Sequence, residues 1–70
     1  MNRTPVKSSN ICSVGYDPFK SLLTVEFLNG SIWAYKDVPV KVYDALMAAP
    51  SVGSFLAREI KPTYASEKVS

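Results

Sequence analysis

Two aromatic residues separated by a single position, Trp33 and Tyr35, are the side chains of this 70-residue chain best suited to binding a ligand. Aromatic rings on a sheet surface can stack on unpaired RNA bases, because every base presents a π face. The alternative is that both rings belong to the core beneath helices, with only the tyrosine hydroxyl reaching the surface. The register of the strands decides between these two interpretations.

Four basic side chains could contact phosphate groups if the predicted helices close onto the strand that carries Tyr35. They are Lys36, Lys41, Arg58 and Lys61. Each such contact would add to the salt dependence of binding. The alternative is an ordinary solvated surface, because Asp37, Asp44 and Glu59 are interleaved with the basic residues. The candidate residues for binding RNA or a protein partner are Tyr35, Lys36, Lys41, Arg58, Lys61 and Tyr64.

Catalytic chemistry has little support in the sequence. There is no histidine, so the thiol of Cys12 and the hydroxyls of Ser8 and Ser9 lack a histidine base to activate them. Cys12 lies on an apolar face of a predicted strand, which indicates a buried and unreactive thiol. The carboxylates do not have the spacing of metal ligands, and a single thiol makes a poor zinc set. We therefore expect no enzyme activity, no metal site and no cofactor.

Length and composition indicate one small cytoplasmic domain. Seventy residues suffice for a single domain, and a hydrophobic fraction of 47% is typical of a folded chain. A single cysteine and an N-terminal segment without the apolar core of a secretion signal favour the reducing cytoplasm. No apolar run approaches the roughly 20 residues that span a bilayer, so we expect no membrane association. The net charge of +2 permits contact with nucleic acid but does not indicate it.

Alternating apolar residues and turn residues predict three strands, at residues 11–17, 21–28 and 31–36. In the first strand, Cys12, Val14 and Tyr16 would share one face. Outside these elements, residues 1–7 are expected to form a mobile arm and residues 65–70 to fray, which leaves an ordered core at about residues 6–64.

The turn at Asn29-Gly30 allows two registers for the hairpin. A two-residue turn would place Trp33 and Tyr35 on the face opposite Phe27. A three-residue loop, with Gly30 in the left-handed region, would pair Val25 with Trp33 and Leu23 with Tyr35. A shift of one residue moves every side chain to the other face. We favour the three-residue loop, because it gathers the large apolar side chains on one side, and it makes core the better interpretation of the two aromatic residues.

Two helices are predicted after the strands. The first covers residues 39–48, beginning at Pro39, and has an apolar stripe that includes Ala45 and Leu46. The second covers residues 52–61 and begins after Ser51, a favourable N-cap residue. The predicted fold is therefore α+β, a three-stranded antiparallel meander with two C-terminal helices packed on one face.

A series of residues along the chain resembles a known family. The series is SSNI at 8–11, VGYD at 14–17, Leu23-x-Val25-x-Phe27, Gly30, Trp33-x-Tyr35, Val38-Pro39, Ser51-x-Gly53-x-Phe55, Ile60 and Tyr64. Its order and spacing resemble the KTSC domain, the C-terminal domain of some lysyl-tRNA synthetases, which also occurs as small separate proteins in bacteria and phages. The resemblance covers about residues 6–64. No single motif is specific, and the combination carries the assignment.

The resemblance implies a small, non-catalytic binding module. The family's Tyr-x-Tyr motif corresponds to Trp33-Ala34-Tyr35, with one aromatic exchanged, and an asparagine typical of its second helix is replaced by Ala57. RNA binding has been suggested for the family, and it is the first function that the resemblance implies. The alternative is a phage- or prophage-type protein-interaction module that binds and modulates a host protein.

Overall fold

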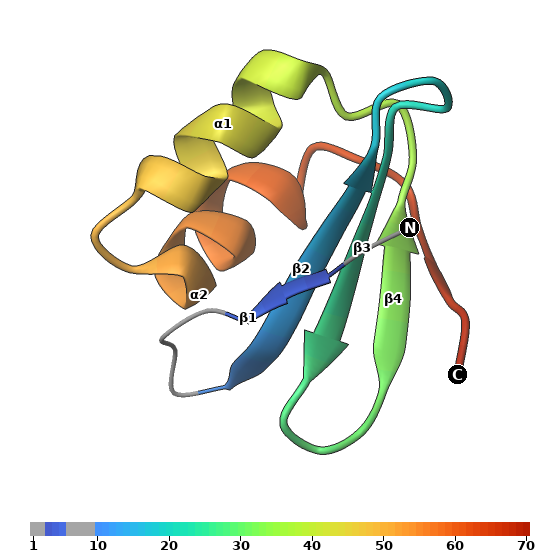
Figure 1. The fold of residues 1–70 in the computed structure, drawn as a ribbon, viewed down its shortest axis with the longest axis vertical. Helices are drawn as coiled ribbons and strands as arrows, with labels where there is room; N and C mark the ends of the chain where they lie inside the picture. The colour runs from blue at the N-terminus through green and yellow to red at the C-terminus, as the bar shows by residue number, and fades with distance from the viewer. Residues whose placement is uncertain (1–2, 6–9) are drawn as a thin grey trace.

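Each β-strand of the structure pairs with the next strand along the sequence. The structure is a computed structural model that describes residues 3–5 and 10–70. Within those residues it contains an antiparallel sheet of five strands in the order β1-β2-β3-β4-β5. Figure 1 labels the first four strands, and β5 belongs to the red segment that leads to the C-terminus. The strands are β1 (Arg3–Pro5), β2 (Ile11–Asp17), β3 (Leu22–Phe27), β4 (Ile32–Tyr35) and β5 (Ser66–Lys68). The three predicted strands therefore form the centre of the sheet, and the prediction of only three strands is wrong.

The two additional strands lie at the sheet edges. Strand β5 runs along β4, where the Lys36 N–H donates to Ala65 O at 2.9 Å and the Val69 N–H donates to Ile32 O at 2.7 Å. The structure thus differs from the expectation that residues 65–70 fray, because backbone pairing holds a segment whose strand residues all have exposed side chains. Strand β1 likewise replaces part of the expected N-terminal arm, while residues 1–2 and 6–9, including Ser8 and Ser9, lie outside the described residues.

The central hairpin has the three-residue loop. Leu23 pairs with Tyr35 and Val25 pairs with Trp33, as that register predicts. The Phe27 N–H donates to Ser31 O and the Gly30 N–H donates to Phe27 O, both at 2.9 Å. Gly30 has a φ of 92°, a region that glycine occupies without the steric penalty of a Cβ. The preferred register is therefore confirmed, and the two-residue turn is wrong.

A β-bulge at Cys12 interrupts the alternation in β2. Ile11 pairs with Phe27 and Ser13 pairs with Glu26, so Cys12 is an additional residue without a direct partner. Such a residue resets which side chains face the core, and Ile11 and Val14 are both buried. Cys12 itself is exposed, so the prediction of a buried thiol is wrong.

The helices lie where the sequence places them. Helix α1 (Val40–Ala48) begins directly after Pro39, and its buried residue is Leu46, whereas Ala45 is exposed instead of contributing to the predicted stripe. Helix α2 (Val52–Phe55) begins after Ser51, whose hydroxyl accepts the Ser54 N–H at 3.3 Å, as expected of an N-cap.

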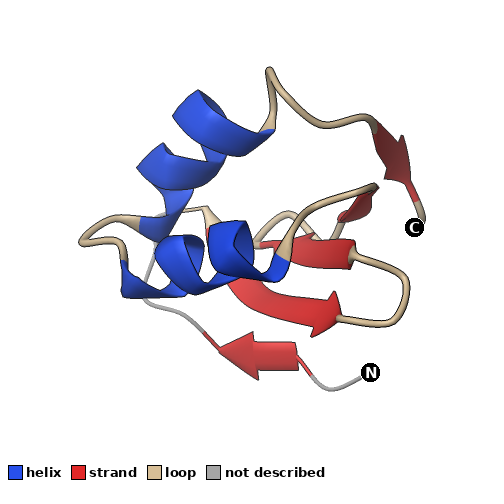
Figure 2. Cartoon of the chain, turned by 90° about the horizontal axis from the view of Figure 1, so that it is seen from above, coloured by secondary structure: helices blue, strands red, loops and turns tan. Residues whose placement is uncertain are grey.

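Helix α2 continues into η1 (Leu56–Ile60), a segment of π-helical geometry. The Lys61 N–H donates to Leu56 O at 2.9 Å, a bond that spans five residues instead of four. Val52, Leu56 and Ile60 are buried along this helix, so the widened turn keeps an apolar stripe facing the sheet. Both helices lie on the same side of the sheet (Figure 2), as predicted.

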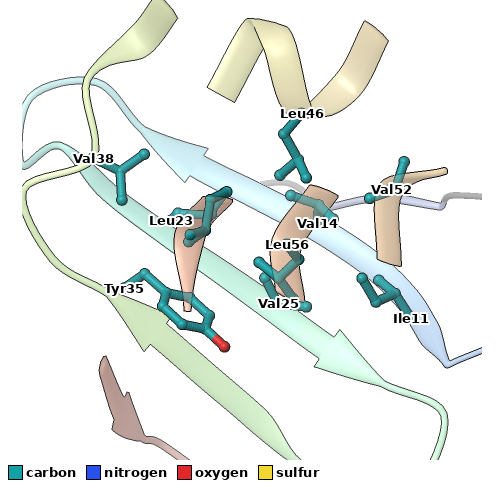
Figure 3. Close-up of a cluster of buried hydrophobic side chains, with 10 residues drawn as sticks. Ile11, Val14, Leu23, Val25, Tyr35, Val38, Leu46, Val52 and Leu56 are labelled. Atoms are coloured by element: carbon teal, nitrogen blue, oxygen red, sulfur yellow. The ribbon is translucent and has the colours of Figure 1, made fainter. Parts of the chain in front are cut away.

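The core lies between the helices and one face of the sheet (Figure 3). Its buried members are Ile11, Val14, Leu23, Val25, Tyr35, Val38, Leu46, Val52, Leu56 and Ile60. Tyr16 joins the layers, because its hydroxyl donates to Val38 O at 2.5 Å and its ring stacks on Tyr43 of α1 with centroids 4.8 Å apart. These contacts hold α1 and the segment before it against β2.

Candidate binding cleft

An open cleft of about 390 Å³ lies on the helix-facing side of the sheet, over β4 and the end of β3. Its lining residues are Phe27, Asn29, Ser31, Trp33, Tyr35, Lys61 and Ser66. Three of them, at positions 31, 33 and 35, are alternate residues and therefore share a face. Its volume falls within the range of small-molecule sites, near the lower end.

The floor of the cleft is aromatic. Tyr35 is only 2% exposed, and this burial raises the pKa of its phenol above the ordinary value of 10.0. Trp33 and Phe27 are partly buried and pack against the core. The expectation that Trp33 and Tyr35 belong with the core residues is confirmed for both. Trp33 is only partly buried and also lines the cleft, so it can contact both the core and a ligand.

The cationic groups around the cleft come from two elements. Lys61, at the end of η1, places its Nζ 5.4 Å from the centroid of the Phe27 ring, within the range of a cation–π contact. Lys68 of β5 is directly opposite Trp33, so its side chain leaves the sheet on the same face. Among the described residues that line the cleft, none is acidic. The site therefore favours a ligand that is flat and carries negative charge.

The polar end of the cleft is organised by the hairpin loop. Asn29 Oδ1 accepts two hydrogen bonds from Ser31, one from its N–H at 3.0 Å and one from its hydroxyl at 2.7 Å. These bonds fix the orientation of the Asn29 carboxamide, although the residue is exposed.

The predicted binding residues do not all meet at this cleft. Tyr35 and Lys61 line it together. Lys36 follows Tyr35 in the sequence and pairs with Glu67, with 3.5 Å between Lys36 Nζ and Glu67 Oε2. Both side chains of this pair are largely exposed, so the ion pair contributes little stability.

The other three predicted residues lie elsewhere. Lys41 is exposed on α1, and Arg58 is exposed on η1. Tyr64 is partly buried and packs against the core. The structure therefore brings together one cation and one aromatic of the predicted set.

Sequence reasoning missed several lining residues. The sequence pattern groups Phe27 with the apolar core side chains and places Asn29 in a turn, and it indicates no cleft for either. Ser66 belongs to a segment that was expected to fray. The Asn29-Gly30 turn was a usable signal, because it places a carboxamide beside the strand that carries Trp33. No such signal marked Ser66.

Two further findings concern metal ions and membranes, and both apply to the described residues. They contain no group of three or more metal-ligating side chains. They also contain no helix that is long and apolar enough to cross a membrane.

Comparison with known proteins shows which family has this sequence and fold. Residues 7–64 match the KTSC domain. The chain belongs to the KTSC domain family. A crystal structure of a KTSC domain protein from Yersinia pestis is similar, with a TM-score of 0.92 and 36% identity, over 99% of this chain and 97% of that one. The family resemblance read from the sequence is thus confirmed.

Two sequence relatives contain a segment similar to this chain in proteins of different length. An uncharacterized protein of Stutzerimonas stutzeri is 39% identical over 64 residues, which is 91% of this chain and 90% of that protein. A lysine–tRNA ligase of Nostoc is 38% identical over 64 residues, which is 91% of this chain but only 11% of the enzyme. The domain is therefore similar both to a small separate protein and to a minor part of a large enzyme.

Proposed function

We propose that this KTSC domain is a non-catalytic, cytoplasmic module that binds RNA by holding one unpaired nucleotide in the cleft. The observation that carries the proposal is the combination of the partly buried Trp33 side chain with the Lys61 ammonium group in one open cleft without acidic lining residues. Stacking of a base on an aromatic ring contributes about 1–3 kcal/mol and tolerates any base, because every base has a π face.

The phosphate of the bound nucleotide would be met by Lys61. In the structure its ammonium group lies over Phe27, a contact without strict geometry that an exposed side chain can exchange for a phosphate. Lys68 is paired with Trp33, and its side chain can reach the next phosphate along the RNA chain. The remaining predicted cations lie outside the cleft and are assigned no direct role.

The Nostoc relative supports an RNA ligand. A segment of that lysine–tRNA ligase corresponds to nearly the whole of this chain, and the name of the enzyme includes tRNA. A domain attached to an enzyme that acts on RNA gains from an affinity for RNA, because it raises the local concentration of the substrate.

A second candidate function is a protein-interaction module, and one observation favours it. Phe19 is 98% exposed at the tip of the β2–β3 loop, and Val40 is 54% exposed at the start of α1. The Val38 N–H donates to Ser21 O at 2.9 Å, which joins the two loops at one end of the molecule. Exposed apolar side chains of this size are suited to a protein partner.

Intrinsic fluorescence tests the RNA proposal directly, because Trp33 is the single tryptophan of the sequence and lines the cleft. Titration with single-stranded RNA should quench its emission. Lys61→Ala should weaken binding about 3- to 10-fold and reduce the slope of log affinity against log salt by about 0.7. Lys41→Ala, a matched loss of one exposed lysine on α1, should leave the cleft affinity nearly unchanged.

Two results would reject the RNA proposal. One is the absence of binding to any single-stranded RNA at low salt. The other is an equal loss of affinity in the Lys41 and Lys61 variants, which would indicate general charge attraction. If a specific protein is recovered from host lysate after nuclease treatment and no RNA co-purifies, the protein-interaction function is supported instead.

A further inference from the structure

The side chain of Tyr35 is almost completely buried, yet its hydroxyl has no hydrogen-bond partner among the described residues. Only 2% of the residue is exposed. Within the described part of the chain, every side-chain oxygen or nitrogen that is fully buried has a partner. The Tyr35 hydroxyl makes no hydrogen bond there, so its oxygen must account for part of the small area that stays exposed.

This exposed part of Tyr35 opens into the cleft. Tyr35 is a core residue on the helix-facing side of the sheet, and it also lines the cleft. Its cross-strand neighbour on one side is Leu23, which is buried. Its neighbour on the other side is Ser66, which is small, exposed and part of the cleft lining. Figure 3 shows the Tyr35 oxygen pointing away from Val38 and Leu23. A ligand in the cleft can therefore reach a hydroxyl that no protein group uses.

A phenylalanine at position 35 would fill the same space without a polar group. The hydroxyl costs free energy where it lies, because it loses most of its hydration and gains no hydrogen bond within the protein. An unsatisfied group of this kind needs a physical explanation, and a ligand that completes the hydrogen bond supplies one. Burial also raises the pKa of the phenol, so at neutral pH the group is an uncharged hydroxyl that can donate or accept.

We propose that the Tyr35 hydroxyl forms a hydrogen bond with the nucleotide bound in the cleft. The inference rests on the proposed RNA-binding function, and it adds a polar contact to stacking on Trp33. Because a hydroxyl can both donate and accept, this contact does not require a particular base. Tyr35 is thus a binding residue through its hydroxyl, while its ring belongs to the core.

Tyr35→Phe removes the hydroxyl and keeps the ring. We expect the affinity for a single-stranded oligouridylate to fall about 3- to 10-fold, the worth of one hydrogen bond. The readout is Trp33 fluorescence, excited where tyrosine does not absorb. Tyr43→Phe is the matched control, because Tyr43 loses the same group from α1, outside the residues that line the cleft. Its affinity for the oligonucleotide should be unchanged.

Thermal unfolding at neutral pH separates a contact with the ligand from a structural role. If the hydroxyl has no partner within the protein, Tyr35→Phe should have a Tm equal to that of the parent chain or higher. A clear fall in Tm would show that the hydroxyl is bonded within the folded protein, and it would overturn the inference.

The binding results distinguish this inference from the function on which it rests. If the Tyr35 variant binds RNA as tightly as the parent chain, the inference is rejected and the RNA-binding function stands. Equal losses of affinity in the Tyr35 and Tyr43 variants also reject it, because the loss would then not come from the cleft. If the parent chain binds no RNA, the proposed function fails and the inference fails with it.

Discussion

Replacing Gly30 by alanine tests the loop that sets the register of the central hairpin. Gly30 has a φ of 92°, a conformation that residues with a Cβ rarely adopt. Apart from Gly30 itself and its two neighbours in the chain, a Cβ built at this position would have no heavy atom within 4 Å. The substitution therefore introduces no clash. The change in the free energy of unfolding then reports only the cost of the backbone conformation at position 30.

The size of the effect follows from two opposing terms. Placing a residue with a Cβ in the left-handed region costs about 1–2 kcal/mol. Alanine also reduces the conformational entropy of the unfolded chain, which offsets about 0.4–1 kcal/mol. We expect a net loss of about 1 kcal/mol in the free energy of unfolding. For a domain of this length, that loss lowers Tm by about 4–8 °C.

Urea denaturation followed by far-UV circular dichroism measures the loss of stability in Gly30→Ala. Gly30→Asn is the matched variant, because asparagine tolerates positive φ better than alanine does, and it should lose less. An alanine variant as stable as the parent chain would refute the reasoning, since it would mean that Gly30 does not hold a left-handed conformation in solution.

Three further predictions concern single side chains. Burial raises the pKa of Tyr35, so above about pH 10 the unfolded chain loses this proton first, and the free energy of unfolding should fall as pH rises. Tyr35→Phe should reduce that fall in alkaline urea titrations, and an unchanged pH dependence would contradict it. Cys12, which is exposed, should react with a thiol reagent in the native state without denaturant, whereas reaction only after unfolding would show that it is covered. Ser51→Ala removes the oxygen that accepts the Ser54 N–H and should lower the free energy of unfolding by about 1 kcal/mol in urea, with Ser70→Ala as the neutral control.

The parts of the fold that the sequence predicted correctly depend on local signals. The apolar alternation of residues 23, 25 and 27, followed by Asn29-Gly30, was enough to choose the register. Ser51, a favourable N-cap residue, was enough to place the start of the second helix. In each case the physical cause lies within a few residues of its effect, so a single sequence contains it.

The features that the sequence did not predict depend on residues distant along the chain. Strand β5 has exposed side chains and no apolar alternation, and its order comes from the backbone of β4. The bulge at Cys12 arises because β2 has one more residue than β3 over the paired segment. The sequence of either strand alone does not reveal this difference. The cleft joins Phe27, Lys61 and Ser66 from three different elements, so its aromatic and cationic groups meet only after folding.

The π-helical turn of η1 has the geometry that results from inserting one residue into an α-helix. Deleting Ala57, which is exposed, would restore four-residue spacing across this turn. The segment after the deletion would then rotate by about 100°, the angle between successive residues of an α-helix. Lys61 would turn away from Phe27, and either the cleft would lose its cation or Ile60 would leave the core. In relatives whose helix is shorter by one residue, we therefore expect the basic residue that lines the cleft to lie one position away from the residue that a sequence alignment pairs with Lys61.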